Sequence, residues 1–433
     1  MTRAVRVLGW ALPAAAFAVM GAVVARGLYL ARSEGEELGL PFPPFIGRWA
    51  PSAELGWSLG AAALLGAAVW LGPRLLSPRL PGAAFAVVLL AFTLALRLAL
   101  SATSRGTMQW SRVFDPAGFE GPNEYLPALT ALTYGRDVFL DRFAELVPAL
   151  PVHAAGHPPG LLVVMDTFAV TTPQRLAALC IAGGALTAPL AYALGRTLLE
   201  DERRARIAGL LTALGPSLLL LGATSADALF ATIGLLAAWP LASDRRPARL
   251  VGALLLALAS LFAWSLLAIG AWAALLAWRR RGWKAMLGLG LTCGLVLIAV
   301  HGTFAAATGF DPIGTVRATE MVYRFGIASE RPYGFWLLGS PTAFLLMLGL
   351  PTTWFALRAL ARGEGTALAI FAVLAVAAGL GFTKAEVERI WLCFAPLVCL
   401  AAAAALPERA LRVSLALLAV HALAWELLWN TVW

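Results

Sequence analysis

The chain has 433 residues, of which 60% are hydrophobic and only 13% are charged, and its mean hydropathy is +0.80. Repeated apolar runs of about 20 residues are long enough to cross a bilayer core of roughly 30 Å, whereas membrane strands alternate weakly over segments of about 10 residues. The composition therefore excludes a soluble globular domain and predicts an all-α, polytopic bundle of transmembrane helices that forms a single integral-membrane domain.

The apolar segments predict about 11 to 13 membrane spans. The first segment resembles a signal peptide, but in a chain with many later spans it is better interpreted as an uncleaved first span. Residues 1–102 hold the N-terminal spans, 103–173 form a long loop, and 174–433 hold the remaining spans. The segment 249–278 is either a tight hairpin or one long helix. The expected spans are 7–30, 54–72, 82–102, 174–199, 205–222, 226–242, 249–262, 264–278, 284–305, 335–357, 365–382, 390–406 and 411–430.

The distribution of charge predicts the orientation. If the N-terminus is cytoplasmic, the inner loops carry 19 of the 33 basic residues but only six of the 24 acidic ones. The positive-inside rule expects this asymmetry, which places the long loop and the loops 306–334 and 383–389 outside the cell membrane. The net charge of +9 is then explained by orientation and by contact with anionic membrane lipids, so nucleic acid is not an expected partner.

The long outer loop gathers the ionisable residues. A loop of this length is uncommon unless it has a function. It holds two of the four histidines, His153 and His157, and seven acids: Asp115, Glu120, Glu124, Asp137, Asp141, Glu145 and Asp166. A carboxylate beside a membrane-facing cavity can act as general base on a hydroxyl, although a single loop acid is more often only solvated. Glu124 and Asp115 are the preferred candidates, since they lie nearest the third span beside aromatic residues.

The segment His157-Pro158-Pro159-Gly160 precedes an apolar run, 161–170, that is too short to span the membrane. It predicts a juxtamembrane or re-entrant helix whose first turn is fixed by proline. His153 and His157 have i, i+4 spacing, but Gly156 and the prolines argue against the regular helix that a metal pair needs. We therefore expect the histidines to hydrogen-bond to substrate or to loop backbone, with no metal site and no cofactor indicated.

Three further outer segments carry candidate residues. Asp227 lies at the start of a span, where Thr224 and Asp227 have capping-box spacing, so it either caps the helix or lines the cavity. Arg331 and Tyr333 combine a cation with an aromatic ring, which suits a phosphate or a sugar face, or simply a loop salt bridge.

The last of these segments precedes the span at 390–406. Thr383 and Glu386 have capping-box spacing, which argues against a catalytic role for Glu386. Lys384 and Arg389 bring positive charge to the start of an outer helix, where a lipid phosphate is the natural ligand.

Together these residues resemble the GT-C superfamily of polytopic glycosyltransferases, which includes the protein O-mannosyltransferase and lipid A aminoarabinose transferase types. The likeness covers roughly residues 82 to 400. It is carried by Glu124-Tyr125 in the first large outer loop, the His-Pro-Pro-Gly segment, Asp227, and the segment from Lys384 to Arg389. Asn123 stands where many members have Asp, which keeps Asp115 in contention, and two additional spans precede the loop, where members usually have one.

The resemblance implies a polyprenyl-phosphate sugar as donor and an acid of the first outer loop as base in an inverting transfer. Glu124 or Asp115 would then be catalytic, and Lys384, Arg389 and Arg331 would bind the donor phosphate. Tyr125, His153, His157, Asp227 and Tyr333 would bind substrate.

Several functional classes stay open at this point. The acceptor is a glycan, a lipid or a protein. The alternatives to a transferase are a transporter or flippase of lipid-linked sugars, an oligosaccharide polymerase or ligase, and a membrane scaffold without catalytic activity. A transporter would show two similar halves and charges near mid-membrane, neither of which is visible in the sequence.

Overall fold

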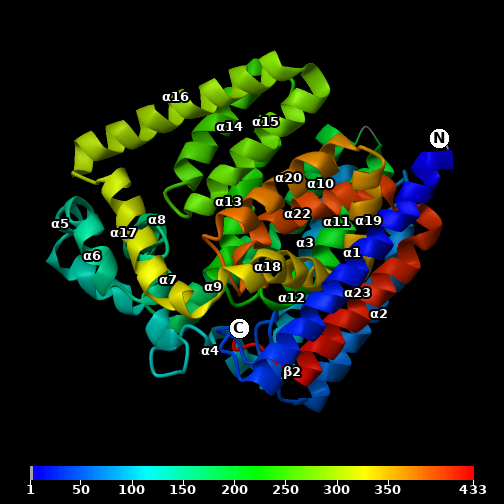
Figure 1. Ribbon diagram of the computed structural model, residues 1–433, viewed down its shortest axis with the longest axis horizontal. Helices are drawn as coiled ribbons and strands as arrows, with labels where there is room; N and C mark the ends of the chain where they lie inside the picture. Colours follow the sequence, from blue (N-terminus) through cyan, green and yellow to red (C-terminus); the bar gives the residue numbers. More distant parts are fainter. Residues whose placement is uncertain (1–2, 200) are drawn as a thin grey trace.

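The structure is a computed structural model that describes residues 3–199 and 201–433, and it is almost entirely helical (Figure 1). Six of its helical segments are long and apolar enough to cross a membrane, which confirms the predicted helical membrane fold. They are α1 (Arg3–Tyr29), α2 (Leu55–Leu75), α3 (Gly82–Ser101), α9 with α10 (Pro173–Ala185 and Thr187–Leu198), α16 (Trp283–Thr308) and α23 (Glu408–Leu428).

The other apolar segments form shorter or broken helices. The span expected over 335–357 is bent by 114° between α18 (Tyr333–Met347) and α19 (Leu350–Ala361). Gly349 lies at the bend with φ +108°, and a Cβ there would be 2.1 Å from the side chain of Leu418, so only glycine fits. The segment 249–278 is two helices, α14 (Arg246–Ala259) and α15 (Leu267–Arg281). The other expected spans correspond to α11 (Glu202–Leu214), α12 (Pro216–Leu220), α13 (Ala226–Leu241), α20 (Gly365–Leu380) and α22 (Ala395–Ala405).

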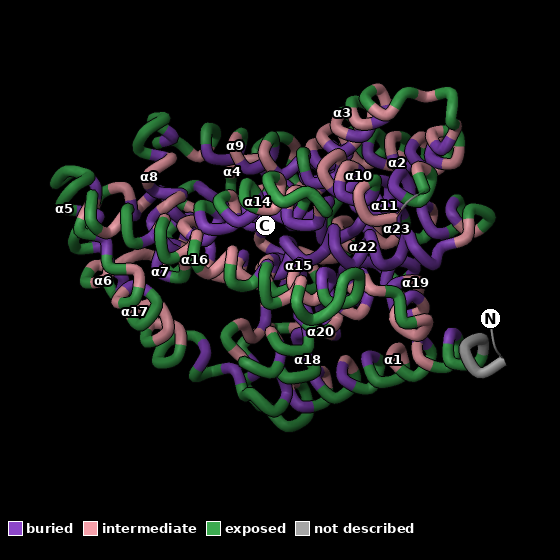
Figure 2. Tube along the Cα trace, turned by 90° about the horizontal axis from the view of Figure 1, so that it is seen from above, coloured by how far each residue is buried: buried purple, intermediate pink, exposed green. Residues whose placement is uncertain are grey.

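The core of the bundle is centred on α22, whose residues are small and almost all buried (Figure 2). Its alanines allow α11 and α19 to pack closely against it, as small residues do between membrane helices. By contrast α16 projects beside α14 and α15 (Figure 1). Its side chains Leu291, Leu295 and Ile298 are exposed. Such a surface suits contact with lipid.

The loops meet in two groups at opposite ends of the bundle. At the end of α2 that holds Leu75, Arg206 donates hydrogen bonds to the carbonyl oxygens of Leu75, Ser77 and Leu80. At the other end, the amide of Glu54 donates to the carbonyl of Thr103, so the long loop begins beside the start of α2. The segment 75–80 and Arg206, which the charge pattern assigns to the cytoplasmic side, therefore lie at one end of α2, and the start of the long loop lies at the other end.

The long loop folds into short helices and turns, as the sequence predicted. One of its helices and the turn Val147–Ala149 pack against α17 (Pro312–Phe325), which belongs to the loop 306–334. The elements are α4 (Gln109–Arg112), α5 (Arg136–Asp141), α6 (Phe143–Leu146), α7 (Val152–Ala155), α8 (Gly160–Thr167) and the 3₁₀ turns Gly106–Met108, Gly121–Asn123, Pro127–Tyr134 and Val147–Ala149. α8 follows Pro159, as expected of the His-Pro-Pro-Gly segment.

Two segments far apart in the chain close the same end of the bundle. β1 (Arg48–Trp49) and β2 (Trp429–Asn430) form an antiparallel ladder in which Arg48 is opposite Asn430. The rings of Trp49 and Trp429 pack edge to face with their centroids 5.1 Å apart. This pairing places Trp433 beside the long loop.

Candidate functional site

A buried arginine joins several segments at the end of the bundle where the long loop lies. Arg389 lies in α21 (Val387–Ile390), and only 7% of its side chain is exposed. Its Nη1 donates to Asp227 Oδ2 at 2.6 Å and its Nη2 donates to Glu386 Oε2 at 3.2 Å. Because burying a charge is costly unless it is paired, these contacts join the start of α13 to the segment before α22. Burial by itself lowers the pKa of Arg389, but the charges of Asp227, Glu386 and Glu124 outweigh it and raise the pKa, so the guanidinium stays charged.

A second arginine completes this network. Arg331 donates from Nη2 to Glu386 and from Nη1 to the carbonyl oxygen of Lys384. Burial alone would raise the pKa of Glu386, but Arg389 and Arg331 lower it to about 2. Glu386 has φ +55°, a left-handed conformation that is uncommon for a non-glycine residue and that functional sites often retain.

Two carboxylates of the long loop converge on one histidine. Nε2 of His153 lies 2.9 Å from Oε1 of Glu120 and 3.9 Å from Oε1 of Glu124. The indole Nε1 of Trp433 donates to the same Glu124 oxygen at 3.4 Å. The second oxygen of Glu124, Oε2, is buried and has no hydrogen-bond partner in the described part of the chain.

The electrostatics of this group follow from its burial. Burial raises the pKa of Glu124, while His153 and Arg389 partly oppose the shift. For His153, burial lowers the pKa, but the charge of Glu124 and the hydrogen bond with Glu120 outweigh it, so the net pKa is raised. A carboxyl with a raised pKa close to an imidazole is suited to exchange a proton near neutral pH.

A cavity of about 480 Å³ opens directly beside these groups. Glu120, Glu386 and Trp433 line one part of it, and the ring of Trp433 also stacks on the guanidinium of Arg389 at 4.4 Å. Its other walls carry three exposed arginines that have no ion-pair partner within the described ranges: Arg48, Arg105 and Arg112. Acid–base groups and unpaired cations therefore border one space.

The structure brings most of the predicted residues together. Glu124, His153, Asp227, Arg389 and Arg331 belong to one connected group, as described above. Tyr125 and His157 pack beside it, with ring centroids 6.2 Å apart, and His157 also contacts Phe230 at 5.0 Å.

The two histidines have different surroundings. Burial chiefly lowers the pKa of His157, to about 4, so it is neutral, and its Nδ1 has no hydrogen-bond partner among the described residues. Because α7 ends at Ala155, His153 and His157 do not share a helix face. No group of three or more His, Cys, Asp or Glu side chains suited to a metal is found over 3–199 and 201–433.

Three of the predicted residues lie away from the cavity or have protein partners. Asp115 is exposed, and its Oδ1 accepts from the amide of Ala117 in a turn. The hydroxyl of Tyr333 donates to the carbonyl oxygen of Gly379. The ammonium of Lys384 donates to the carbonyl oxygens of Ala328 and Arg331, which fastens the loop 306–334 to the start of α21.

Both capping predictions need correction. Thr383 does not cap a helix through Glu386; its hydroxyl accepts from Trp391 Nε1, and Glu386 faces the cavity in buried ion pairs. At α13 the cap is Ser225 rather than Thr224, and the Asp227 carboxylate accepts from both Ser225 and Arg389.

The sequence analysis assigned no role to Glu120 and found no local signal for Arg48, Arg105, Arg112 or Trp433, all of which line the cavity.

Comparison of the chain with models of protein families, with curated proteins and with solved structures found no match. The function must therefore be argued from the site itself.

Proposed function

We propose that the chain is a GT-C-type glycosyltransferase that moves a sugar from a polyprenyl-phosphate donor to an acceptor at the outer face of the cell membrane. The observation that carries the proposal is the cavity of about 480 Å³, with a Glu–His–Glu group on one side and three arginines around it that have no ion-pair partner among the described residues. A sugar-phosphate transfer needs both parts: a base for the acceptor hydroxyl and cations for the departing phosphate.

The carboxylates of the long loop act on the acceptor. Its hydroxyl oxygen attacks the anomeric carbon, the bond from that carbon to the phosphate oxygen breaks, and the electron pair leaves with the phosphate. The hydroxyl proton passes to the group formed by Glu120, His153 and Glu124. Glu120 borders the cavity and Glu124 lies behind it, and both face the same imidazole nitrogen. His153 positions the two carboxylates and balances their charge.

The phosphate is held by arginines other than those suggested by the sequence. Arg331 and Arg389 are already paired with Glu386 and Asp227, and Lys384 is bound to carbonyl oxygens. We assign the donor phosphate to Arg48, Arg105 and Arg112, whose guanidinium groups border the cavity without an acidic partner in the part of the chain that the structure describes. Arginine forks suit the oxygens of a phosphate.

The location supports a lipid-carried donor. Nucleotide sugars are cytoplasmic, and the cavity lies at the end of the bundle that the charge pattern predicts to be outside. Leu40, Pro41 and Val432 add an apolar wall beside the arginines, next to which an isoprenoid chain can lie.

The test is a transfer assay on membranes that contain the chain, offered a panel of polyprenyl-phosphate sugars and a mixture of envelope acceptors. Wild type should transfer at least one sugar, and Glu120→Gln and Glu124→Gln should each reduce the rate roughly 100-fold or more, the usual range for a general base. Asp115→Asn is the matched control, because it removes an exposed acid of the same loop and should keep near-wild-type activity.

Other results would contradict the proposal. Full activity in both glutamine variants would remove the Glu–His–Glu group from the reaction, and an inactive Asp115→Asn variant would move the base to that residue. Movement of the intact lipid-linked sugar across a vesicle membrane, without transfer, would show that the chain is a flippase.

A further inference from the structure

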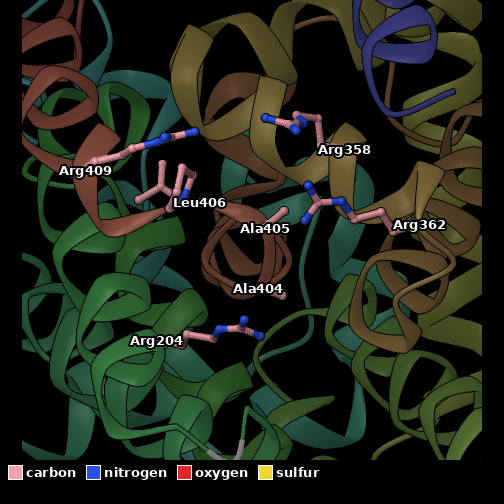
Figure 3. Close-up of a pocket in the computed structure, with 8 residues that line it drawn as sticks. Arg204, Arg358, Arg362, Ala404, Ala405, Leu406 and Arg409 are labelled. Carbon is pink, nitrogen blue, oxygen red and sulfur yellow. The ribbon is translucent and has the colours of Figure 1, made fainter. Parts of the chain in front are cut away.

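A second cavity, of about 280 Å³, lies at the opposite end of the bundle (Figure 3). Four arginines from three helices line it: Arg204 of α11, Arg358 and Arg362 at the end of α19, and Arg409 of α23. Figure 3 shows these side chains arranged around the last turn of α22, which ends at Ala405. None of these arginines belongs to the outer site.

The charge of this cavity is not balanced by the protein around it. The carboxyl end of a helix carries roughly half a negative charge, so α22 offsets only a small part of four guanidinium charges. Among the residues that the structure describes, one carboxylate lies within ion-pair distance of the four: Asp201 Oδ2 is 3.7 Å from Nε of the exposed Arg204. Glu408 is directed to Arg203 instead. The cavity is therefore strongly positive.

Two of these arginines have Nε donors without a hydrogen-bond partner in the described part of the chain. The Nε atoms of Arg358 and Arg362 are buried, and neither has a hydrogen-bond partner within 3–199 and 201–433. The guanidinium of Arg358 stacks on the ring of Trp10 at 4.7 Å, which fixes its position at the edge of the cavity. Buried polar groups are nearly always paired, so unpaired ones bordering a positive cavity point to an anionic ligand.

We propose that this cavity binds a phosphate group. Guanidinium forks bind phosphate oxygens with directed, charge-assisted hydrogen bonds, and four of them surround a space that holds a phosphate with part of its substituent. The cavity lies among the loops that the charge pattern assigns to the cytoplasmic side, where phosphate comes from the headgroup of an anionic lipid or from a soluble phosphate compound. This site is separate from the transfer reaction and does not depend on it.

The test measures binding to the full chain in nanodiscs. Thermal unfolding is followed in phosphatidylcholine alone, with added phosphatidylglycerol, and with inorganic phosphate or pyrophosphate in solution. We expect an anion to raise the unfolding temperature of the wild type. The Arg358→Gln/Arg362→Gln variant should bind roughly thirtyfold more weakly, since each arginine near an anionic surface contributes about 1 kcal/mol.

Two further variants keep the result interpretable. Arg245→Gln/Arg246→Gln removes the same charge from exposed arginines on the same side but outside the cavity, and it should bind like the wild type. Arg204→Gln/Arg409→Gln removes the two exposed arginines of the cavity and should weaken binding even if loss of Arg358 disturbs folding.

The probes identify the source of the phosphate. Stabilisation by phosphatidylglycerol alone identifies a lipid headgroup, whereas stabilisation by phosphate or pyrophosphate identifies a soluble ligand. If no probe stabilises the wild type, or if both cavity variants respond like the Arg245/Arg246 control, the proposal is wrong.

Discussion

The buried ion pairs around Arg389 make a strong prediction about stability. Among the described residues, Arg389→Ala leaves the Asp227 carboxylate with the hydroxyl of Ser225 as its one side-chain partner, and it leaves the Glu386 carboxylate with Arg331. Removing one partner of a buried pair costs about 3–5 kcal/mol, because the remaining charge is left uncompensated. The stacking of Arg389 on Trp433 adds about 0.5–2 kcal/mol. We therefore expect the free energy of unfolding to fall by at least about 3 kcal/mol.

The matched control is Arg324→Ala. Arg324 also pairs with a carboxylate, that of Glu320, but both side chains are exposed on α17. Its loss should cost at most about 1 kcal/mol. The measurement is denaturant titration in mild detergent, followed by tryptophan fluorescence.

A double-mutant cycle separates the ion pair from other effects of the substitution. Asp227→Asn combined with Arg389→Ala should cost less than the sum of the single changes, by about 0.5–3 kcal/mol, because no unpaired charge remains at this pair. A strictly additive cycle, or an Arg389→Ala variant as stable as the Arg324→Ala control, would refute the reasoning.

Three further predictions concern the candidate site and the residues around it. Glu388 is buried and accepts from the amide of Ile46 at 2.8 Å, and burial raises its pKa to about 7. Because the pKa of Glu388 is raised in the folded state, its contribution to stability is present below the unfolded pKa of about 4.5 and is lost as pH rises through about 7. Glu388→Gln should therefore make the free energy of unfolding fall less between pH 5 and 8. An unchanged dependence of the unfolding free energy on pH would contradict this. Gly121→Ala would place a Cβ 1.8 Å from the carbonyl oxygen of Asp115, so the turn carrying Glu120 and Glu124 must shift. Transfer should fall about 100-fold, whereas Gly60→Ala, with nothing within 4 Å, should be silent in the same assay. Arg105→Ala and Arg112→Ala should each raise the KM for the donor about tenfold, because each loses one charge-assisted hydrogen bond to the phosphate. Arg142→Ala is the control, since Arg142 is an exposed arginine of the same loop. Equal KM values in all three variants would exclude Arg105 and Arg112 as phosphate ligands.

Hydropathy predicted the positions of the helices because each apolar segment must be buried or face lipid. It missed the bend at Gly349, because the hydropathy of a 23-residue apolar segment is the same for a straight helix and for a bent pair of helices. What decides the bend is the close approach of Leu418, a contact from a helix about 70 residues further along the chain, as the numbering shows.

The sequence pointed to those residues of the candidate site whose type is unusual for their position in the chain. Acids and histidines in one loop, and Asp227 at a helix start, were visible in the sequence because residue type and position alone made them unusual. The capping-box interpretation of Glu386 failed because a spacing rule considers only neighbours in the chain, and here the buried arginines Arg331 and Arg389 compete for the carboxylate. The role of Arg389 as a structural cation likewise depended on the distant Asp227.

The pairing of β1 with β2 has a consequence for biosynthesis. Arg48 emerges early from the ribosome, and its strand partner Asn430 emerges some 380 residues later, as their numbers show. During that interval the long loop is present without Trp433, so the part of the cavity wall that Trp433 forms is completed only after the final helix has been made. A chain stalled before that helix would contain most of the bundle and yet lack one wall of the cavity.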